Sequence, residues 1–356
     1  MGLLYTNMKM FHFKEKLDTL PAASNEIQAP LHVRIKPTNA CAHDCWYCAY
    51  RKENIQLGKD MEKRGRIPEE KMMEIIEDFS EIGVRAVTFS GGGDPFYYPP
   101  LPQSLEKLAE ADIRFAALTN GARLDGRLAE LFAAYGSWIR ISLDGWDRNS
   151  YAQYRNISPT EYDRMWNNMA QFKKMNTGCL LGVVIVIDQK NAPHVYDMVR
   201  ALHDIGVNSV KLSPCIISND QQKSIDYQSS CADAVTEQIE RAINDFHSDQ
   251  FQISNGYRLQ LQTFHKAYHW CPYVQINPVI GADLNVYTCH DKAYNIEQGL
   301  LFSMQKQRFI RGWFADKKTF MQVDPSHDCN HHCLVDGKNS MILEYLDVDQ
   351  EHSVFV

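Results

Sequence analysis

Three cysteines lie close together near the start of the chain, at Cys41, Cys45 and Cys48 in the stretch "CAHDCWYC". Thiolates are good ligands for zinc and for iron–sulfur clusters. A closed tetrahedral zinc site needs four ligands, and His43 in the same stretch or a distant residue would supply the fourth. In a [4Fe–4S] cluster, three cysteines hold three irons and leave the fourth iron open. The triplet therefore predicts either a zinc site with a borrowed ligand or a cluster with one open iron.

Four more cysteines form a second group near the end of the chain: Cys271, Cys289, Cys329 and Cys333. Four thiolates saturate one site, which is either a structural zinc ion or a [4Fe–4S] cluster. Histidines in the same segments offer further ligands for zinc, namely His290, His331 and His332. Because the sequence shows ten cysteines and no recognisable export signal, we expect reduced thiols and metal ligands rather than disulfides.

The residues between the two groups alternate short apolar runs with amphipathic helices. Six runs predict strands, at residues 32–37, 85–90, 114–119, 138–143, 180–188 and 209–214. The segments "EIGVRAVTFS" and "DIGVNSVKLS" repeat one pattern of helix end, glycine turn and strand. Recurring units of this kind indicate parallel strands covered by helices. We predict a partial (β/α)6 TIM-like barrel, with its functional face at the carboxyl ends of the strands.

Small, polar or ligand-type residues follow five of these six strands. The cysteine triplet follows the first strand, and the second, third, fourth and sixth strands run into "SGGGDP", "TNG", "SLDG" and "SPC". Each motif alone is compatible with an ordinary turn. Their coincidence with the triplet predicts a site at this end of the barrel.

The helix–strand pattern gives way to a polar, helix-prone stretch near residue 220. We expect an N-terminal extension over residues 1–30, the barrel over 31–220, a helical bridge over 221–265 and a small α+β cluster-binding domain over 266–356. In the last of these, "VQINPVIGADLNVYTC" predicts a hairpin that turns at residues 281–283 and presents Cys289.

Composition narrows the class of partner. A net charge of -7 disfavours non-specific binding to nucleic acid or to anionic membranes, which normally requires a basic face. The longest apolar run, residues 180–187, is far shorter than the roughly 20 residues that span a bilayer. We expect a cytoplasmic protein with a small-molecule or protein partner, and neither a nucleic-acid nor a membrane partner.

The first cysteine group resembles the signature of the radical S-adenosylmethionine (SAM) enzymes, C-x-x-x-C-x-aromatic-C, and its place after the first strand also fits. The resemblance implies that Cys41, Cys45 and Cys48 hold a [4Fe–4S] cluster whose open iron binds SAM. One electron from that cluster, supplied by a donor such as flavodoxin or ferredoxin, would cleave SAM to methionine and a 5′-deoxyadenosyl radical. The radical would then abstract a hydrogen atom from a substrate.

The resemblance also implies SAM-binding roles for residues at the strand ends. Tyr47 matches the aromatic residue beside the adenine, and the glycine-rich segment matches the one that receives the methionine amino group. Asp94 stands where the family more often has glutamate, so its role is open. The complete set implied to bind SAM is Tyr47, Ser90, Gly91, Gly92, Gly93, Asp94, Asn120, Ser142 and Asp144.

The second cysteine group is similar to the twitch domain, a shortened relative of the SPASM domain that binds one auxiliary [4Fe–4S] cluster. A cluster saturated by four cysteines would carry an electron rather than bind substrate, which favours net oxidation. We therefore expect dehydrogenation of a small polar, carbohydrate-like substrate.

Two residues of the last predicted strand are candidates for catalysis. Lys211 would face inward as a substrate contact or base. Cys215 is either a buried apolar residue or a hydrogen-atom donor, which would make the enzyme an epimerase or another redox-neutral catalyst. Modification of a peptide is a further alternative. We expect it less, because only about 30 residues precede the first strand and relatives that act on peptides often carry an extra recognition domain.

Overall fold

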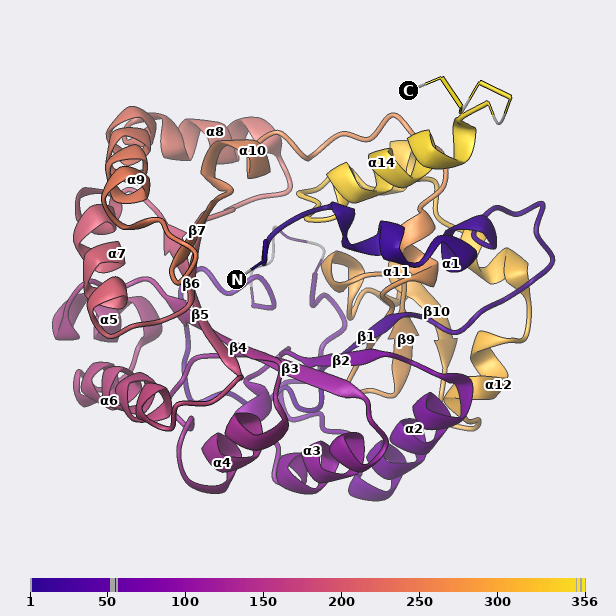
Figure 1. Ribbon diagram of the computed structural model, residues 1–356, viewed down its shortest axis with the longest axis horizontal. Helices are drawn as coiled ribbons and strands as arrows, with labels where there is room; N and C mark the ends of the chain where they lie inside the picture. Colours follow the sequence, from indigo (N-terminus) through magenta and orange to yellow (C-terminus); the bar gives the residue numbers. More distant parts are fainter. Residues whose placement is uncertain (1, 52–54, 56, 350, 353, 356) are drawn as a thin grey trace.

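The computed structural model describes residues 2–51, 55, 57–349, 351–352 and 354–355. In these residues one curved sheet of ten strands forms the centre, with most of the longer helices outside it (Figure 1). The strand order is β10-β9-β8-β1-β2-β3-β4-β5-β6-β7, and all neighbours from β8 through β1 to β7 are parallel. Because β10 and β7 are free edges of this sheet, the barrel is open, in agreement with the predicted partial barrel.

The strands are short and the helices connect them in sequence. The strands are β1 (His32–Ile35), β2 (Ala86–Phe89), β3 (Arg114–Thr119), β4 (Trp138–Leu143), β5 (Leu180–Ile187), β6 (Ser209–Pro214), β7 (Gln252–Asn255), β8 (Val279–Ile280), β9 (Asn285–Tyr287) and β10 (Leu300–Ser303). The outer helices are α2 (Glu69–Ile82), α3 (Leu101–Glu110), α4 (Gly126–Tyr135), α5 (Arg148–Arg155), α6 (Thr160–Lys174), α7 (Val195–Asp204), α8 (Gln221–Ser229) and α9 (Ala232–Phe246).

Shorter helices lie in the terminal segments and loops. They are α1 (Lys14–Asp18), α10 (Tyr257–Gln260), α11 (Ile296–Gly299), α12 (Phe309–Trp313) and α13 (Pro325–Asp328), followed by the longer α14 (Asp336–Asp347). The 3-10 helices are η1 (Met8–His12), η2 (Pro95–Tyr97), η3 (Ala192–His194), η4 (Pro272–Gln275), η5 (His290–Lys292) and η6 (Lys317–Met321). Among the described residues, none of the helices combines the length and the apolar composition needed to cross a membrane.

All six predicted strands are confirmed, and the structure adds a seventh parallel strand, β7, beside β6. The expected helical bridge over 221–265 is thus only partly helical, because β7 and α10 follow α8 and α9 within it. The sequence of β7, "QISN", contains one apolar residue, so it gave no strand signal. Its place is fixed by backbone pairing with β6 instead.

Along a strand, successive side chains alternate between the face that packs against the helices and the face that lines the inside of the barrel. In β4, Ile139, Ile141 and Leu143 are fully buried, whereas Trp138 and Arg140 on the other face are half-buried. The buried face packs against the helices, as expected for parallel strands in a βα series. The half-buried face lines the inside of the curved sheet.

The C-terminal hairpin continues the barrel sheet instead of forming a separate one. Strands β8 and β9 pair antiparallel around the predicted turn, and β8 pairs parallel with β1, with Ile35 opposite Ile280. Backbone amides of β1 and the residue after it donate to this segment, including Lys36 N to Ile280 O at 2.8 Å. The turn of this hairpin therefore lies next to the loop that carries the first cysteines, and Cys289 follows β9, which runs back toward the amino end of β1.

Candidate functional site

The first cysteine loop leaves β1 and rests on the end of α5. The amide of Asp44 donates to Arg155 O at 2.8 Å, and the amide of Trp46 donates to Tyr154 O at 3.1 Å. The helix ends there because Asn156 adopts a left-handed conformation with φ of 50°. Carbonyls in the last turn of a helix lack intrahelical partners. The loop uses two of them, which fixes its position relative to β4 and α5.

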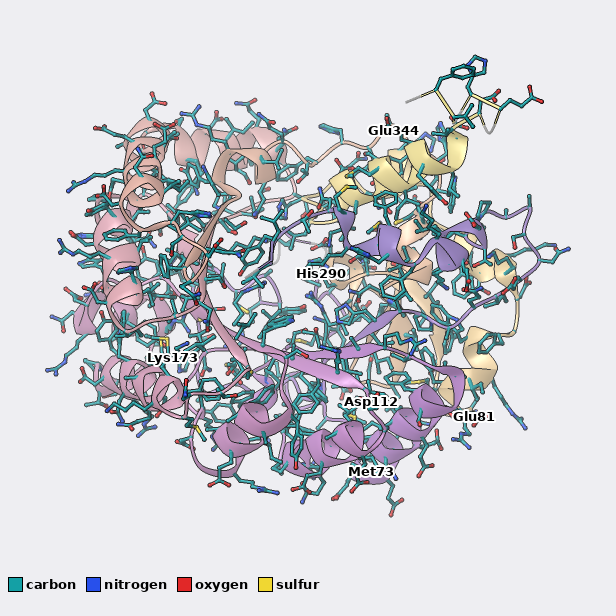
Figure 2. All side chains as sticks on the ribbon, in the orientation of Figure 1. Met73, Glu81, Asp112, Lys173, His290 and Glu344 are labelled. Atoms are coloured by element: carbon teal, nitrogen blue, oxygen red, sulfur yellow. The ribbon has the colours of Figure 1, made fainter. Side chains whose placement is uncertain are left out.

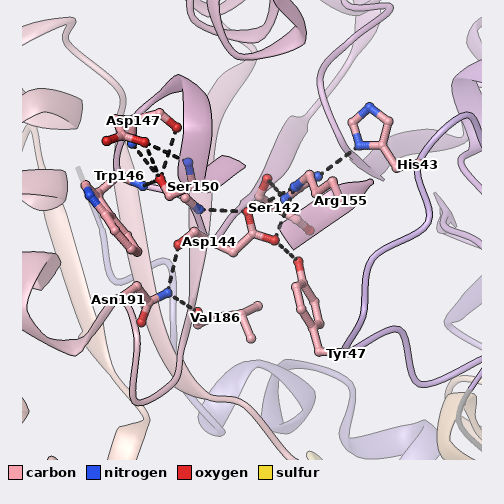
Figure 3. Close-up of polar contacts among 11 residues, drawn as sticks. His43, Tyr47, Ser142, Asp144, Trp146, Asp147, Ser150, Arg155, Val186 and Asn191 are labelled. Carbon is pink, nitrogen blue, oxygen red and sulfur yellow. Dashed lines mark hydrogen bonds and ion pairs between the residues drawn. The ribbon is translucent and has the colours of Figure 1, made fainter. Parts of the chain in front are cut away.

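A buried ion pair holds the same loop from inside (Figure 3). The side chain of Arg155 donates through Nε to both carboxylate oxygens of Asp144, at 3.0 and 3.2 Å, and through Nη2 to Ser142 O at 2.7 Å. Tyr47 Oη donates to Asp144 Oδ2 at 2.5 Å. Asp144 has no exposed surface. The structure therefore shows Tyr47 and Asp144 bound to each other, and their predicted contacts with SAM stay predictions.

The glycines after β2 allow this segment to lie against the chain that precedes the cysteines. The amide of Gly93 donates to Thr38 O at 3.1 Å. A Cβ added to Gly92 would stand 2.2 Å from Asn39 Oδ1, and one added to Gly93 would stand 2.1 Å from Ala40 O. Only residues without a side chain fit this approach, so the glycines are required whether or not they also bind SAM.

Asp94 is committed to the scaffold. It accepts hydrogen bonds from Phe96 N at 2.9 Å, from Thr119 Oγ1 at 3.0 Å and from Asn120 N at 2.6 Å. It is also buried, which raises the pKa of its carboxyl group. Asp94 thus ties the glycine segment to the end of β3. Asp94 also lies close enough to the triplet for its charge to help raise the pKa of Cys41, and the amide of Asn120 lies 3.9 Å from Cys41 Sγ.

The three thiols lie near one another in a site that disfavours their charged form. Burial raises the pKa of Cys41 and Cys48, and raises that of Cys45 to about 12 with contributions from both other thiols. Thiolates at this buried site need a nearby positive charge to balance their own negative charge. A bound metal ion or cluster supplies that charge to its cysteine ligands. Ser90 Oγ and His43 Nε2 are buried nearby and lack hydrogen-bond partners among the described residues. A thiolate-bound cluster fits this donor set.

The geometry bears on the zinc alternative as well. Sulfur ligands of one tetrahedral zinc lie about 3.8 Å apart, as bonds of about 2.3 Å require. In the part of the chain that the structure describes, no three Cys, His, Asp or Glu side chains converge on a position for a single metal ion. A cluster binds each cysteine through a different iron and so takes a wider set of thiols.

The second group of cysteines is gathered from four separate elements. Cys271 precedes η4, Cys289 follows β9, Cys329 ends α13 and Cys333 precedes α14. Burial raises the pKa of Cys289 to about 12, with contributions from Asp291 and Cys271. The pKa of Cys333 is raised by burial and also by Cys289. Burial likewise raises the pKa of Cys329 to about 12, with a contribution from Cys289. The four predicted ligands therefore form one neighbourhood.

Polar side chains support this second group, and the sequence analysis missed them. Asn339, which is 1% exposed, donates through Nδ2 to Cys271 Sγ at 3.2 Å. The buried ammonium of Lys266 donates to Cys329 O at 2.6 Å, and that of Lys292 donates to Asp328 O at 2.6 Å. A buried positive charge beside several thiolates offsets their negative charge. The tripeptide Lys-Ala-Tyr occurs near Cys271 and again near Cys289, and this repeat was a usable signal.

Lys36 lies between the two cysteine groups. It is 1% exposed and donates to Gly91 O at 3.0 Å and to the hydroxyl of Tyr50. Burial lowers the pKa of Lys36 well below its usual value, whereas Cys289 and Cys48 act to raise it. One ammonium is thus close to a cysteine of each group.

The two catalytic candidates on and after β6 differ in access. Lys211 is half-buried on the inner face of the sheet, and burial together with neighbouring cations lowers its pKa to about 8. Cys215 is only 2% exposed, and Gln228 of α8 donates to its carbonyl at 3.2 Å. The inward position expected for Lys211 is therefore seen, and Cys215 lies under α8.

Parts of the chain are similar to known proteins. Residues 35–191 match the model of the Radical SAM superfamily. The GTP 3′,8-cyclase of Chlorobaculum tepidum is 27% identical over 192 residues, which are 51% of this chain and 54% of the relative. An S-adenosylmethionine-dependent nucleotide dehydratase of Lacinutrix mariniflava is 22% identical, over 42% of this chain and 33% of the dehydratase. The chain thus spans about half, or less, of the length of these curated relatives.

Two solved structures share the fold at low sequence identity. Streptococcus suis SuiB bound to S-adenosylmethionine superposes with a TM-score of 0.63 at 14% identity, over 90% of this chain and 75% of SuiB. The anSMEcpe protein with bound AdoMet superposes with a TM-score of 0.58 at 16% identity, over 89% of this chain and 95% of its own. Both likenesses extend beyond residue 191 and therefore include part of the C-terminal segment.

Proposed function

We propose that this chain, whose residues 35–191 match the model of the Radical SAM superfamily, is an enzyme of that superfamily and dehydrogenates a small polar substrate. A [4Fe–4S] cluster, when bound, supplies the electron that cleaves SAM reductively to methionine and a 5′-deoxyadenosyl radical. Cys41, Cys45 and Cys48 would hold that cluster. The packing of their loop against the glycine segment and the ends of β3 and β4 supports this cluster site, and the gathering of four cysteines at the second site is the observation that carries the oxidation.

The surrounding residues would bind and orient SAM. Ser90 supplies a buried hydroxyl without a partner among the described residues, and Asn120 directs its amide toward Cys41 Sγ. Backbone groups of Gly91, Gly92 and Gly93 would accept the methionine amino group. Tyr47 and Asp144 would act mainly by holding the cysteine loop in place. Asp94 would do the same for the glycine segment.

Net oxidation requires the substrate to lose a hydrogen atom, a proton and an electron. The deoxyadenosyl radical would take the hydrogen atom from carbon. Lys211 would contact the substrate as a cation, because its pKa of about 8 leaves most of its amine charged near physiological pH, and the proton would pass to solvent. Cys271, Cys289, Cys329 and Cys333 would hold a second [4Fe–4S] cluster as the electron acceptor. An external donor such as flavodoxin or ferredoxin would supply the electron that starts each turnover.

The redox-neutral alternatives gain less support from the contacts. An epimerase would need Cys215 to reach the substrate radical, and that residue is only 2% exposed, with its carbonyl bound to Gln228 of α8. Among the relatives, the named activities include a cyclase and a dehydratase, and SuiB has been solved with its precursor peptide. These activities belong to longer or distant proteins, so the oxidation inferred from four saturating cysteines remains our proposal.

Anaerobic reconstitution followed by single-turnover assays tests the proposal. Two clusters predict about eight irons and eight sulfides per chain. With a chemical reductant and no substrate, the wild type should release 5′-deoxyadenosine from SAM. Replacing Cys41, Cys45 and Cys48 by alanine should abolish that product, and its persistence would contradict the assignment.

The electron-acceptor role is tested separately. Cys289→Ala should lower the iron content by about four and still permit cleavage of SAM. With substrate, this variant should fail to form the oxidised product, whereas Cys215→Ala should form it. If Cys215→Ala alone stops the product, and product made in D2O gains carbon-bound deuterium, the enzyme is an epimerase.

A further inference from the structure

Three strands present basic side chains on the inner face of the sheet. These are Arg34 on β1, Arg140 on β4 and Lys211 on β6, each half-buried among buried neighbours in sequence. Side chains alternate between the two faces of a strand, so these residues lie opposite those that pack against the helices. The inner face of a barrel of this type is normally filled by apolar side chains. Three cations there need an explanation.

The cations are close to one another and to a fourth from the C-terminal segment. The charges that lower the pKa of Lys211, after burial, are those of Arg140, Lys338 and Arg34. Lys338 belongs to α14 and is half-buried. His290, which follows Cys289, lies near the same cations, because Arg34 and Lys211 add to the effect of burial in lowering its pKa. Figure 2 shows His290 inside the curve of the sheet.

Among the described residues, few acidic groups compensate this positive charge. Of the ion pairs among the described residues, none involves Arg34, Arg140, Lys211 or Lys338. Arg140 Nε is buried without a hydrogen-bond partner, and its guanidinium lies 5.0 Å from the ring centres of Tyr5 and Trp138. The buried Asp291 offsets part of the charge of Arg34.

Clustered cations with too few acids beside them are costly in a protein interior, and the cost is relieved when an anion binds. This excess of positive charge is confined to one part of the molecule, because the chain as a whole carries a net charge of -7. We propose that Arg34, Arg140, Lys211 and Lys338 bind an anionic group of the substrate, either a phosphate or a carboxylate, inside the barrel. This inference rests on the proposed function and names the chemical class of the substrate.

The position suits such a role. Arg34 on β1 precedes Lys36 by two residues, a rise of about 7 Å in extended chain, and the cysteine loop begins just beyond Lys36. An anionic group bound among the four cations would leave the remainder of the substrate extending toward the carboxyl ends of the strands. The predicted SAM residues lie at those ends. The four cations would therefore orient the substrate carbon toward the radical.

Calorimetric titration of the reconstituted protein tests the inference, with pyrophosphate, citrate and uncharged myo-inositol as probes. We expect pyrophosphate or citrate to bind, with an affinity that falls as salt is raised. Arg140→Met and Lys338→Met should each weaken that affinity about tenfold or more, which is the loss expected for one charged hydrogen bond. Lys223→Met removes an exposed lysine of α8 and should leave the affinity unchanged. Thermal unfolding of each variant verifies its folding.

The outcomes separate this inference from the proposed function. Tighter binding of pyrophosphate assigns a phosphate, and tighter binding of citrate assigns a carboxylate. If neither anion binds, or if both bind Arg140→Met as well as the wild type, the inference is overturned. Cleavage of SAM by the wild type is measured in the same preparation. A protein that cleaves SAM and ignores anions disproves the anion site alone, whereas one that binds anions and never cleaves SAM disproves the proposed function.

Discussion

Tyr47, the residue before the third cysteine, donates its hydroxyl to a carboxylate oxygen of Asp144 at a distance of 2.5 Å. Both groups are held on a rigid base, because Arg155 binds the same carboxylate and α5 supports the cysteine loop. The contact links the loop that carries the triplet to the end of β4. It makes the aromatic position a structural anchor of the site.

Tyr47→Phe removes this anchor while it keeps the ring. We expect the variant to retain iron less well during gel filtration with a chelator, because the loop loses its bond to Asp144 and Asp144 loses a charged hydrogen bond. Iron content and the visible absorbance of the reconstituted protein measure the change. The matched control is Tyr196→Phe, which removes a hydroxyl bound to Asp245 at 2.6 Å on the surface. Equal iron retention in both variants would show that the loop does not depend on Tyr47.

Arg155→Met should strongly destabilise the fold. The variant leaves the carboxylate of Asp144 buried without its partner, and breaking a buried ion pair in this way costs about 3–5 kcal/mol. Urea unfolding of the protein without metal measures the loss. Arg148→Met breaks an exposed pair with Asp163 and should cost less than about 1 kcal/mol. If Arg155→Met cost as little stability as Arg148→Met does, water would have to reach Asp144.

Asn339→Leu should change the auxiliary site without removing a ligand. The amide donates to Cys271 Sγ, and hydrogen bonds to ligand sulfurs stabilise the reduced form of a cluster. We expect the midpoint potential of the second cluster to fall, while the spectrum of the first is unchanged. Redox titration followed by electron paramagnetic resonance resolves the two. Asn149→Leu, at an exposed position of α5, is the control, and an unshifted potential in Asn339→Leu would contradict the assigned contact.

The stability of the protein should depend on pH through Lys211. Its pKa is lowered from 10.5 to about 8 by burial and by Arg140, Lys338 and Arg34, with His290 and His332 facing it from the C-terminal loops. Below about pH 8 the amine is charged in both the folded and the unfolded protein. The full cost of burying that charge then lowers the stability of the folded state. Between about 8 and 10.5 the unfolded chain binds more protons, so this contribution to stability rises with pH.

Comparison of the wild type with Lys211→Met isolates that contribution. The buried thiols have raised pKa values, so their contribution to stability falls as pH rises. This contribution is the same in the wild type and in Lys211→Met, and it cancels in the comparison. The difference in unfolding free energy between the two proteins should therefore shrink as pH rises through 8. A difference that stays constant with pH would show that Lys211 keeps its ordinary pKa.

The sequence predicted the repeated elements well because periodic patterns reflect burial directly. Six parallel strands, the open barrel and the hairpin before Cys289 all follow from apolar runs and turn residues. Strand β7 was missed because its pairing, not its composition, places it. Side-chain partners such as Lys266 and Asn339 were also missed, since their roles depend on which loops meet in space.

For the candidate site, motif positions were easier to predict than the contacts that they make. The seven cysteines form the two expected neighbourhoods. Asp94 and Asp144, in contrast, are bound to neighbouring protein groups, which a motif alone does not reveal. The inner cations are separated by more than a hundred residues between Arg34 and Arg140, so only the fold brings them together.

The pairing of β1 with β8 also affects how the barrel behaves when it is separated from the rest of the chain. Amides of His32, Arg34 and Lys36 donate to carbonyls between residues 276 and 280. A fragment that stops before the hairpin would expose these donors along a strand that ordinarily lies inside the sheet, and such strands recruit strands from other molecules. The C-terminal segment therefore protects the barrel against aggregation, independently of any electron that it transfers.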